Sequence, residues 1–543
     1  MRNSIDIIND ILRLRGVISD EDINEFLSDK PKKTYDPFLL HDMKAGVDLL
    51  LSEIEKGNRI CIYGDYDADG VTSVSIMLKG LSYLTDNLFY YIPSRFEEGY
   101  GLNSDAIDAI KERGANLIIT VDCGCVSYKE VEHAKEIGLK VIVTDHHTIN
   151  DVIADCIVIN PKHPKSQYPY RQLAGCGVAF KLLQALQRTA GLPKSMLNEV
   201  LDLVAIGTVG DIVELRDENR TLVKYGLNLL NTRRSDAIKC LAEATSIGEI
   251  ESENIAFGIV PRINAAGRIH HAADAVELFI AKNPADISAG VANLVEYNER
   301  RKKLQEDAYE KCKKMISGDE TFIMLNVEGI HEGIAGIVAG KIKEYYNRSA
   351  VIVTKTGDGF LKGTGRSIDT IDLYDLLSKS ADLFEKFGGH KGACGFLIKE
   401  ENFEQLKSNT LFNVDKLIAE NSAIFDKVLN FDMVLSPDDV NVDLVMALKK
   451  LEPFGEGNPA PVFCIKDAVI KQTSFMGDKQ NHARFVIYAN GEYADGVLFG
   501  KAQDYHDLLF NNSSVNVIGS LMHQVWRGRH QVKFRVEEIE LCR

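Results

Sequence analysis

The sequence is poor in the features that mark secreted, zinc-stabilised and membrane-spanning proteins. Its ten cysteines are dispersed over 543 residues without a CxxC pair, and the close pair Cys123 and Cys125 has no second pair at zinc-finger spacing. No apolar run approaches the ~20 residues that span a bilayer, and charges interrupt the apolar positions of the N-terminal segment, which therefore does not read as a secretory signal. We expect reduced, mostly buried thiols, no structural zinc, no membrane attachment and a cytoplasmic location.

An excess of positive charge is also lacking. The chain has 63 Lys and Arg against 79 Asp and Glu, a net charge of −16. This argues against a protein that coats DNA through general basicity. It does not exclude a nuclease, because a metal-dependent active site is itself rich in carboxylates and a local basic groove can exist within an acidic protein.

Changes in sequence pattern divide the chain into five parts. Residues 1–45 read as peripheral helices. In 46–215, short apolar runs alternate with amphipathic stretches, which is typical of a doubly wound α/β domain with helices on both faces of a parallel sheet. Residues 216–310 are mainly helical and end in one long polar helix, and 311–425 return to α/β alternation. Residues 426–543 carry alternating strands typical of a small β-barrel or sandwich. The expected fold class is therefore α/β: two α/β domains joined by a long helix, then an all-β domain.

The first motif with chemical content is GDYDADG, residues 64–70. Asp65, Asp67 and Asp69 fall on a strand-to-helix turn, at the carboxyl end of a strand, where open α/β sheets bind ligands. Their alternate spacing lets Asp67 and Asp69 reach one ion cluster. Taken alone, the motif leaves two alternatives: an Asx turn with a helix N-cap, or a calcium loop, although Ile76 replaces the glutamate that such a loop needs at its twelfth position.

Three further segments place acids or histidines where apolar runs end. They carry Asp122 in TVDCG, Asp145, His146 and His147 in VTDHH, and Asp211 in VGDIVEL. One acid at a strand end is often a cap, but several in one sheet indicate a site, and paired histidines would need buried partners. Packed together alone, the carboxylates would repel. We expect two divalent cations that clamp the attacking and leaving oxygens of a phosphoryl displacement. The mixed carboxylate and imidazole set favours Mn²⁺, with Mg²⁺ as the alternative.

The chain resembles a known group of enzymes over nearly its whole length. The four motifs of the DHH phosphoesterase superfamily are similar, in the same order, to GDYDADG, VDCG, DHH and VGD. The companion substrate-binding domain, DHHA1, is similar to GTGRS (363–367) and FGGHKGACG (387–395). Within the superfamily, three segments of this chain resemble the RecJ single-strand DNA exonucleases: EEGYGLN (97–103), PRINAAGR (261–268) and PFGEGNPAPVF (453–463). The β-rich tail would match the OB-fold of that family. The ordered set is specific, although each motif alone is not.

The resemblance implies roles for the clustered residues. Those that would hold the metals are Asp65, Asp67, Asp69, Asp122, His146 and Asp211. Asp122 would bridge the two ions, and Asp65 would be an extra ligand. His147 would lie beside the scissile phosphate as a hydrogen-bond donor or acid, and Asp145 would orient a histidine. Some members have a ligating histidine just before the first motif; Tyr63 stands here, which leaves the coordination of one metal open.

Glycine-rich segments in the second α/β domain supply candidate catalytic and phosphate contacts. Arg366 and Ser367 stand among small residues, so that the backbone and the guanidinium can both approach a phosphate; a tight turn with a solvated arginine is the alternative. His390 follows Gly388 and Gly389, where close approach to a ligand or a plain turn would explain the glycines. We expect Arg366 and His390 to face the metals across a cleft.

The remaining candidates for contact with a nucleotide chain are Arg95, Tyr100, Asn103, Arg268, Trp526 and Arg527. A loop-stabilising role is the alternative for the first three, and a structural ion pair is the alternative for Arg268. In the tail, Trp526 beside basic residues on strands suits stacking and backbone tracking of a single strand. A solvated β face around a core tryptophan is the alternative there.

These features together predict a metal-dependent 5′→3′ exonuclease specific for single-stranded DNA, acting in repair and recombination. The polarity and the DNA preference are implied by the resemblance alone, as are a helicase and a single-strand-binding protein as partners of a monomer. One rival is an oligoribonuclease or cyclic-dinucleotide phosphodiesterase of the same superfamily, which usually needs only the two α/β domains. Another is a non-catalytic replication scaffold, which should have lost ligands that are all present here.

Overall fold

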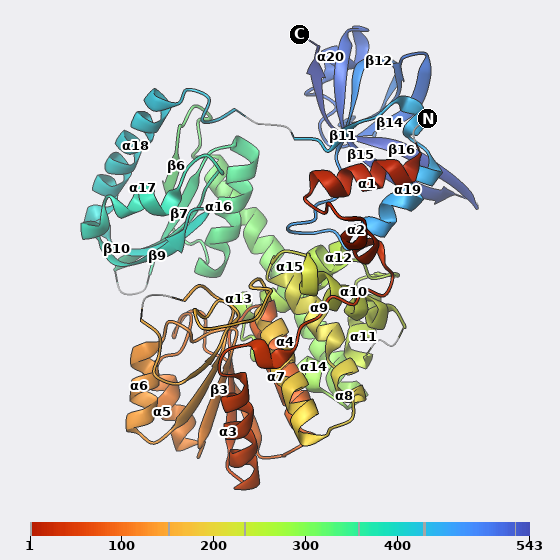
Figure 1. The fold of residues 1–543 in the computed structure, drawn as a ribbon. Coiled ribbons are helices and arrows are strands. Elements are labelled where there is room, and N and C mark those ends of the chain that lie inside the picture. The colour runs from red at the N-terminus through yellow and green to blue at the C-terminus, as the bar shows by residue number, and fades with distance from the viewer. Residues whose placement is uncertain are drawn as a thin grey trace.

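The computed structural model describes residues 3–149, 152–232, 235–356, 359–426, 430–526 and 528–542. Three sheets follow one another along the chain, and Figure 1 shows them in separate lobes joined by helices. All ten cysteines are free thiols and none is exposed. Among the helices of the described residues, none has both the length and the apolar character needed to cross a membrane.

The first sheet is entirely parallel, with the strand order β2–β1–β3–β4–β5. Its strands are β1 (Ile60–Gly64), β2 (Leu88–Tyr91), β3 (Leu117–Val121), β4 (Lys140–Thr144) and β5 (Ile157–Ile159). The covering helices are α3 (Met43–Glu55), α4 (Ala68–Leu81) and α7 (Gly175–Ala190) on one face, and α5 (Ser104–Glu112) and α6 (Tyr128–Glu136) on the other. Because strand side chains alternate between faces, Ile60 and Ile62 enter one core while Cys61 and Tyr63 enter the other. The predicted doubly wound α/β fold is confirmed.

A helical region follows. It contains α8 (Ser195–Asn198), α9 (Leu201–Gly210), α10 (Asp217–Thr232), α11 (Asp236–Ala244), α12 (Ser252–Asn254), the π-helical turn η2 (Ile255–Ile259), α13 (Val260–Ile269), α14 (Ala273–Ile280) and α15 (Pro284–Lys313). The last is the predicted long polar helix. Its beginning buries Ile287 and Leu294 in the core of the first lobe, and its end buries Tyr309 and Cys312 against the second sheet. This helix therefore joins the two α/β lobes.

The second sheet is mixed, with the order β6–β7–β8–β10–β9. Its strands are β6 (Ile323–Asn326), β7 (Ala350–Lys355), β8 (Phe360–Arg366), β9 (Phe384–His390) and β10 (Ala393–Lys399). Only the β6–β7 pair is parallel among these pairings. The helices α16 (Glu332–Tyr346), α17 (Leu373–Ser378) and α18 (Phe403–Glu420) cover it.

The third sheet closes on itself. Its strands are β11 (Met433–Val434), β12 (Phe463–Met476), β13 (His482–Ala489), β14 (Glu492–Leu498), β15 (Ser514–Trp526) and β16 (Arg529–Leu541). Closure follows because β12 pairs with both β13 and β15, which makes a five-stranded barrel with β11 added at its side. The helices α19 (Val442–Leu448) and α20 (His506–Phe510) complete it. The expected small all-β domain is thus a barrel.

The N-terminal helices do more than lie at the periphery. These helices are α1 (Ser4–Leu14) and α2 (Asp20–Leu27). Elsewhere in the chain, short 3₁₀ turns occur at η1 (Pro37–Leu39), η3 (Ala381–Leu383), η4 (Glu400–Asn402), η5 (Pro437–Asp439) and η6 (Lys449–Leu451). The buried face of α1, including Ile7 and Ile11, packs into the barrel core, and Figure 1 shows this helix beside the barrel. Arg15 adds a salt bridge of 3.0 Å to Asp432. Segments from opposite ends of the sequence therefore share one core.

Candidate metal centre

The predicted metal ligands converge at the carboxyl edge of the first sheet. Three overlapping sets of ligand atoms each fit within 4.8 Å: Asp65, Asp67 and Asp122; Asp69, His146 and Asp211; and Asp122, Asp145, His146 and His147. Because Asp122 and His146 each belong to two sets, the three sets form a single centre. Asp122 follows β3 and His146 follows β4, so neighbouring strand ends of one sheet bring them together.

Backbone geometry fixes Asp122 at the middle of the centre. Its φ of +61° lies in the left-handed region, which few non-glycine residues adopt. Its N–H donates to the carbonyl of Thr144 on the neighbouring strand at 3.0 Å. The first residue of α7 is Gly175, where a Cβ would lie 2.4 Å from Asp122 Oδ1. A glycine is therefore needed for α7 to approach the carboxylate.

The helix N-cap alternative for the first motif is observed, and it does not prevent the capping residue from belonging to the candidate metal centre. Asp67 Oδ1 caps α4 by accepting the N–H groups of Asp69 at 3.0 Å and Gly70 at 3.1 Å. The same carboxyl group belongs to one of the converging sets. Asp69 is fully buried and accepts the N–H groups of Gly175 and Cys176 at the start of α7, at 2.7 and 2.9 Å. Helix ends thus orient both acids.

Several buried polar atoms of the centre lack hydrogen-bond partners among the described residues. They are Asp65 Oδ1, Asp122 Oδ1, Asp211 Oδ2 and both ring nitrogens of His146. His146 Nε2 lies 3.1 Å from Asp122 Oδ1 and 3.5 Å from Asp211 Oδ2, but in directions that make no hydrogen bond. Buried polar atoms nearly always have partners. Carboxylate and imidazole atoms that converge without them fit the ligand preferences of Mn²⁺ and Mg²⁺.

Electrostatics lead to the same conclusion. Burial raises the pKa of Asp211 to about 9, and the neighbouring charges of Asp69 and Asp67 add to the effect. Burial and nearby carboxylates likewise raise the pKa of Asp122 well above its usual range. Burial lowers the pKa of His146 to about 4. The protein groups alone therefore disfavour their own charged forms, as expected where bound cations supply the missing positive charge.

His147 lies at the exposed side of the centre and is oriented by Asp145. Its Nδ1 is 2.8 Å from Asp145 Oδ1, which also accepts the N–H groups of both histidines, and Cys125 N–H donates to the other oxygen. Burial acts to lower the pKa of His147, but the hydrogen bond and charge of Asp145 outweigh it and raise the pKa. Tyr100 places its hydroxyl 3.2 Å from the same ring nitrogen. The His147 side chain is 43% exposed, so a substrate can reach it.

The side chain of Tyr63 is hydrogen-bonded to the loop before α5, whereas Asp65 belongs to the candidate metal centre. The Tyr63 hydroxyl donates to the carbonyl of Gly101 at 2.7 Å. Asn103 caps α5 by accepting the N–H of Ala106 at 2.7 Å, and its Nδ2 lies 3.4 Å from the Tyr63 hydroxyl. The side-chain bonds of Asn103 are therefore those of the loop-stabilising alternative.

Arginines from both α/β lobes gather beside the centre. Burial and the charges of Arg95, Arg366 and Arg301 lower the pKa of Arg268 to about 9. Arg268 donates to the carbonyl of Gly333 at 3.0 Å, and no carboxylate of the described residues lies within the 4.0 Å of an ion pair with it. The ion-pair alternative is thus not observed. Arg301 was missed in the sequence because it stands in the polar run ERRKK, where charges usually face solvent; its proximity to Arg268 exists only in the fold.

The glycine-rich strands of the second lobe give their residues different surroundings. Arg366 ends β8, and a Cβ on Gly336 of α16 would lie 3.2 Å from its guanidinium, so a glycine makes room for it. The Ser367 hydroxyl donates to the Ile371 carbonyl and contacts Ser349, so it already has two partners within the protein. Its position is therefore internal.

Gly388 and Gly389 lie in strand β9. The pairing of this strand with β10 explains Gly389 without a turn or a ligand. Gly389 has a φ of +149°, and a Cβ there would lie 2.3 Å from the Ala393 carbonyl of the paired strand β10. Gly388 has open space around it. His390 ends β9, is exposed, and accepts the N–H of Gly392 at 3.2 Å.

The predicted tail contacts fall at the edge of what the structure describes. Trp526 ends β15, where its backbone pairs with Arg529. Arg527 and the side chain of Trp526 lie outside the described residues. Both stay predictions.

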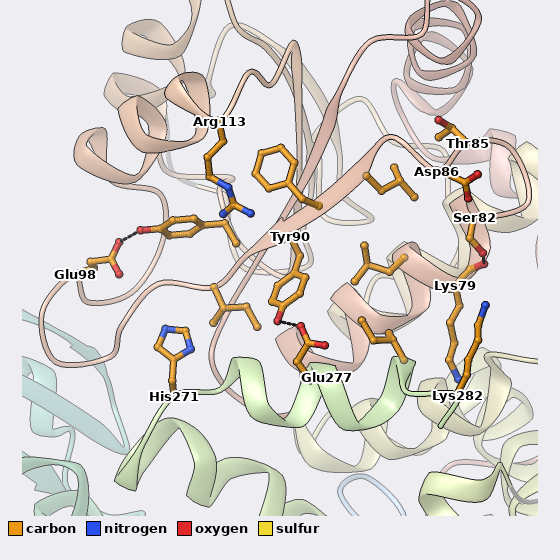
Figure 2. Close-up of a pocket in the computed structure, with 16 residues that line it drawn as sticks. Lys79, Ser82, Thr85, Asp86, Tyr90, Glu98, Arg113, His271, Glu277 and Lys282 are labelled. Atoms are coloured by element: carbon orange, nitrogen blue, oxygen red, sulfur yellow. Dashed lines mark hydrogen bonds between the residues drawn. The ribbon is translucent and has the colours of Figure 1, made fainter. Parts of the chain in front are cut away.

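A cavity of about 740 Å³ lies apart from the centre, along the edge strand β2 (Figure 2). Tyr90 donates there to Glu277, and Tyr91 donates to Glu98 at 2.7 Å. Arg113 stacks over the Phe89 ring at 4.1 Å. None of the clustered Asp and His residues lines this cavity, so it is separate from the metal centre.

Comparison with known proteins assigns the class first. The family model "DHH family, N-terminal domain" matches residues 59–208, "DHHA1 domain" matches 319–411, and "RecJ OB domain" matches 431–538. The parallel sheet with its acidic carboxyl edge, the mixed second sheet and the barrel are therefore those of a DHH–DHHA1 protein with an OB domain.

Individual relatives narrow the class. The chain is 35% identical over 539 residues to the single-stranded-DNA-specific exonuclease RecJ of Bacillus subtilis, covering 98% of this chain and 67% of that protein. It is 34% identical to that of Salmonella typhimurium, covering 85% and 84%. The crystal structure of RecJ in complex with Mn²⁺ from Thermus thermophilus has a TM-score of 0.85 at 29% identity, over 99% of this chain and 76% of that one. The chain belongs to the RecJ family.

Proposed function

We propose that this protein is a single-stranded-DNA-specific exonuclease that hydrolyses phosphodiester bonds from the 5′ end with two divalent cations. The observation that carries the proposal is the centre of converging carboxylate and imidazole atoms that have no hydrogen-bond partners among the described residues, beside a cluster of arginines. The relatives, which are single-stranded-DNA-specific exonucleases, support the substrate, and crystal structures of Thermus thermophilus RecJ in complex with Mn²⁺ and with Mg²⁺ support the cations.

The ions would be held by Asp65, Asp67, Asp69, Asp122, His146 and Asp211. When bound, two such ions stabilise the charge that develops on the attacking and leaving oxygens of a phosphodiester. Asp145 holds His147 in one orientation, and His147 donates a hydrogen bond to the scissile phosphate. The Tyr100 hydroxyl contacts the same ring nitrogen and further restricts the imidazole.

The basic residues hold the substrate backbone. Arg268 and Arg95 from the first lobe and Arg366 from the second bind phosphates beside the centre, because guanidinium groups suit the geometry of phosphate oxygens. His390 and Gly388, on the exposed strand β9, contact the terminal nucleotide. Trp526 and Arg527 guide the incoming strand.

The architecture favours this function over its rivals. A dinucleotide hydrolase would need only the two α/β lobes, whereas this chain also has the helical region 216–310 and the barrel. A scaffold without activity has no use for a complete set of ligands. We propose domain limits of 46–215, 311–425 and 426–543, with α1 packing as part of the barrel domain. A monomer in the cytoplasm that acts beside a helicase and a single-strand-binding protein completes the proposal.

The function is tested with single strands labelled at the 5′ or the 3′ end. In the presence of Mn²⁺, the expected result is release of labelled mononucleotide from the 5′ label first, and none when a chelator is present. A blunt duplex of the same sequence serves as control and should stay intact. Release from the 3′ label alone, or from neither label, would contradict the proposal.

A further inference from the structure

The two edges of the first sheet differ in their hydrogen bonding. At the β5 edge, the backbone N–H of Val158 points away from the sheet and donates to Asp42 Oδ2 at 3.1 Å, so a side chain occupies the outward donor. At the opposite edge, the Asn87 carbonyl accepts a hydrogen bond from β1. Because backbone groups alternate in direction along a strand, those of Leu88 and Tyr90 point outward. No hydrogen bond from another described residue reaches these outward groups.

The free β2 edge forms one wall of the cavity shown in Figure 2. The five consecutive residues 88–92 all line it. Since alternate side chains of a strand point to opposite faces, a cavity that touches every residue of the run lies along the backbone edge itself. The end of α4 and helix α14 form the other walls, and the apolar lining includes Leu78, Leu88, Ile92 and Ile280. A free strand edge beside an apolar cavity is a surface on which an additional strand can pair.

Two lysines lie together at one end of this edge. Lys79 of α4 and Lys282, which follows α14, line the cavity on the same side as Asp86, which precedes β2 (Figure 2). Burial lowers the pKa of Lys79, although the charges of Asp202 and Glu199 act in the opposite direction. A largely buried ammonium group is stabilised by a carboxylate that comes within ion-pair distance. The end of the cavity near the beginning of β2 therefore suits an acidic side chain.

The other charged groups of the cavity leave this preference in place. Two of the three lining carboxylates already accept hydroxyl groups, because Tyr90 donates to Glu277 and Tyr91 donates to Glu98. The third is Asp86. None of the lining basic side chains forms a salt bridge with a described residue; they are Lys79, Arg113, His271 and Lys282. Complementary charge on an occupant is thus negative.

We propose that the β2 edge is a docking site for a partner protein, which adds an extended acidic segment to the first sheet as a sixth strand. The added strand is antiparallel, an arrangement that is common at the edge of a parallel sheet. Its backbone pairs with the outward groups of Leu88 and Tyr90, and its apolar side chains cover the apolar lining. Because the lysines lie near the beginning of β2, an antiparallel strand brings carboxylates at its C-terminal end to Lys79 and Lys282.

The test uses a fluorescent peptide of about six residues, the usual length of a strand, in which valine and threonine alternate before two glutamates and an amidated end. Fluorescence anisotropy measures its binding to the full chain. The wild type should bind it, and Lys282→Glu should weaken binding by roughly tenfold or more, because like charges then meet. A second peptide, with lysines in place of the glutamates, should show the reverse preference. Absence of binding to the wild type, or equal loss of both peptides in Lys282→Glu, overturns the proposal.

Two controls separate strand pairing from charge alone. Lys416→Glu makes the same charge change at an exposed lysine of α18 in the second lobe and should bind as wild type does. N-methylation of one alternate set of peptide amides should abolish binding, whereas methylation of the other set should leave it unchanged. Equal binding of both methylated peptides overturns strand pairing.

The same variant also tests who occupies the edge. Lys282→Glu should have the thermal midpoint of the wild type, which shows that any loss of binding is local. Sedimentation of the chain alone should give a monomer. A dimer that Lys282→Glu dissociates would make a second copy of the chain the occupant and overturn the partner protein.

Discussion

Asp122 combines three properties that each cost folding free energy. Its backbone is left-handed, its side chain is almost fully buried, and neighbouring carboxylates raise its pKa. Residues that break several local rules at once are expected at functional sites, where another interaction offsets the cost. The proposed cations would supply this offset at Asp122, so we expect the stability of the first lobe to depend on them.

The first prediction concerns this carboxylate. Asp122→Asn should lower hydrolysis on the order of 10³-fold, since losing about 4 kcal/mol of charge stabilisation in the transition state corresponds to that factor. The substitution also removes one of the mutually repelling charges, so the variant should unfold at a higher temperature than wild type in a chelator and gain less from added Mn²⁺. Calorimetry with and without the ion measures both. Asp105→Asn, at an exposed acid of α5, is the control; equal stabilisation of Asp122→Asn and wild type by Mn²⁺ would count against the ligand assignment.

A buried ion pair between α7 and α10 belongs to the same lobe. Lys181 Nζ lies 2.9 Å from Glu218 Oε1, with side chains 1% and 0% exposed, and it also donates to the Tyr35 carbonyl. The Tyr168 hydroxyl donates to the second oxygen of Glu218. Removing one partner of such a pair is costly, because the other partner then stays charged and buried without a counter-ion.

The second prediction follows from that asymmetry. Lys181→Met should lower the stability of the first lobe by about 3–5 kcal/mol, measured by chemical unfolding followed in that lobe. Lys181→Met combined with Glu218→Leu should cost less than the single change, because no unpaired charge remains. A double variant less stable than the single one would show that the charge pair is not the source of the loss.

At the scale of elements, one side chain of α10 joins the barrel domain to the catalytic lobe. Arg220 is 3% exposed and donates to the carbonyls of Leu451 at 3.0 Å, Glu452 at 2.7 Å and Phe26 at 3.1 Å. Its guanidinium also stacks on the Phe26 ring at 3.7 Å. The guanidinium therefore links α10 to α2 and to the segment just before the 453–463 motif, and it holds that motif in its position.

The third prediction is that Arg220→Met loosens this joint. Loss of several charge-assisted hydrogen bonds should cost at least about 3 kcal/mol, and the barrel should then unfold in a transition of its own, below that of the α/β lobes. Differential scanning calorimetry resolves the two. Arg171→Met, at an exposed arginine, should leave the profile unchanged. A single transition at the wild-type temperature in Arg220→Met would refute the joint.

The elements differ in how far the sequence predicts them. Continuous apolar runs identify β1, β3 and β4, and the acids at their ends could be assigned to one site because parallel strands end at the same edge. The sequence could not decide whether Asp67 is a helix cap or a metal ligand, because the same residue caps α4 and belongs to the candidate metal centre. Arg301 carries no local signal, because its surroundings are made by segments distant in sequence. The packing of α1 on the barrel is hidden for the same reason.

At the scale of the whole molecule, the net charge hides a local field of opposite sign. The chain carries −16 overall, yet Arg95, Arg268, Arg301 and Arg366 gather where a substrate backbone would pass. Because these cations gather at one place in an acidic protein, a single strand that enters the site is attracted there.

The fourth prediction is a measurable dependence of strand binding on salt. Each phosphate contact to a single strand contributes about −0.7 to the slope of log K against log salt, so contacts from these four arginines should give a slope of about −2.8. Arg301→Ala should reduce the slope by about 0.7. Fluorescence anisotropy with a labelled strand, in a chelator to prevent hydrolysis, gives both values. A slope near zero would mean that phosphates are not bound through these arginines.

The shared core of α1 and the barrel has a consequence for how the protein is made. The core that buries Ile7 and Ile11 is made by helix α19 and by the barrel strands, the last of which ends at Leu541. At synthesis rates of about 5–20 residues per second, the helix waits on the order of 25–105 s for the last of its partners. Throughout that time its apolar face is open to chaperones and proteases, while the two α/β lobes are already able to fold. A helix translated early is thus among the last to be buried.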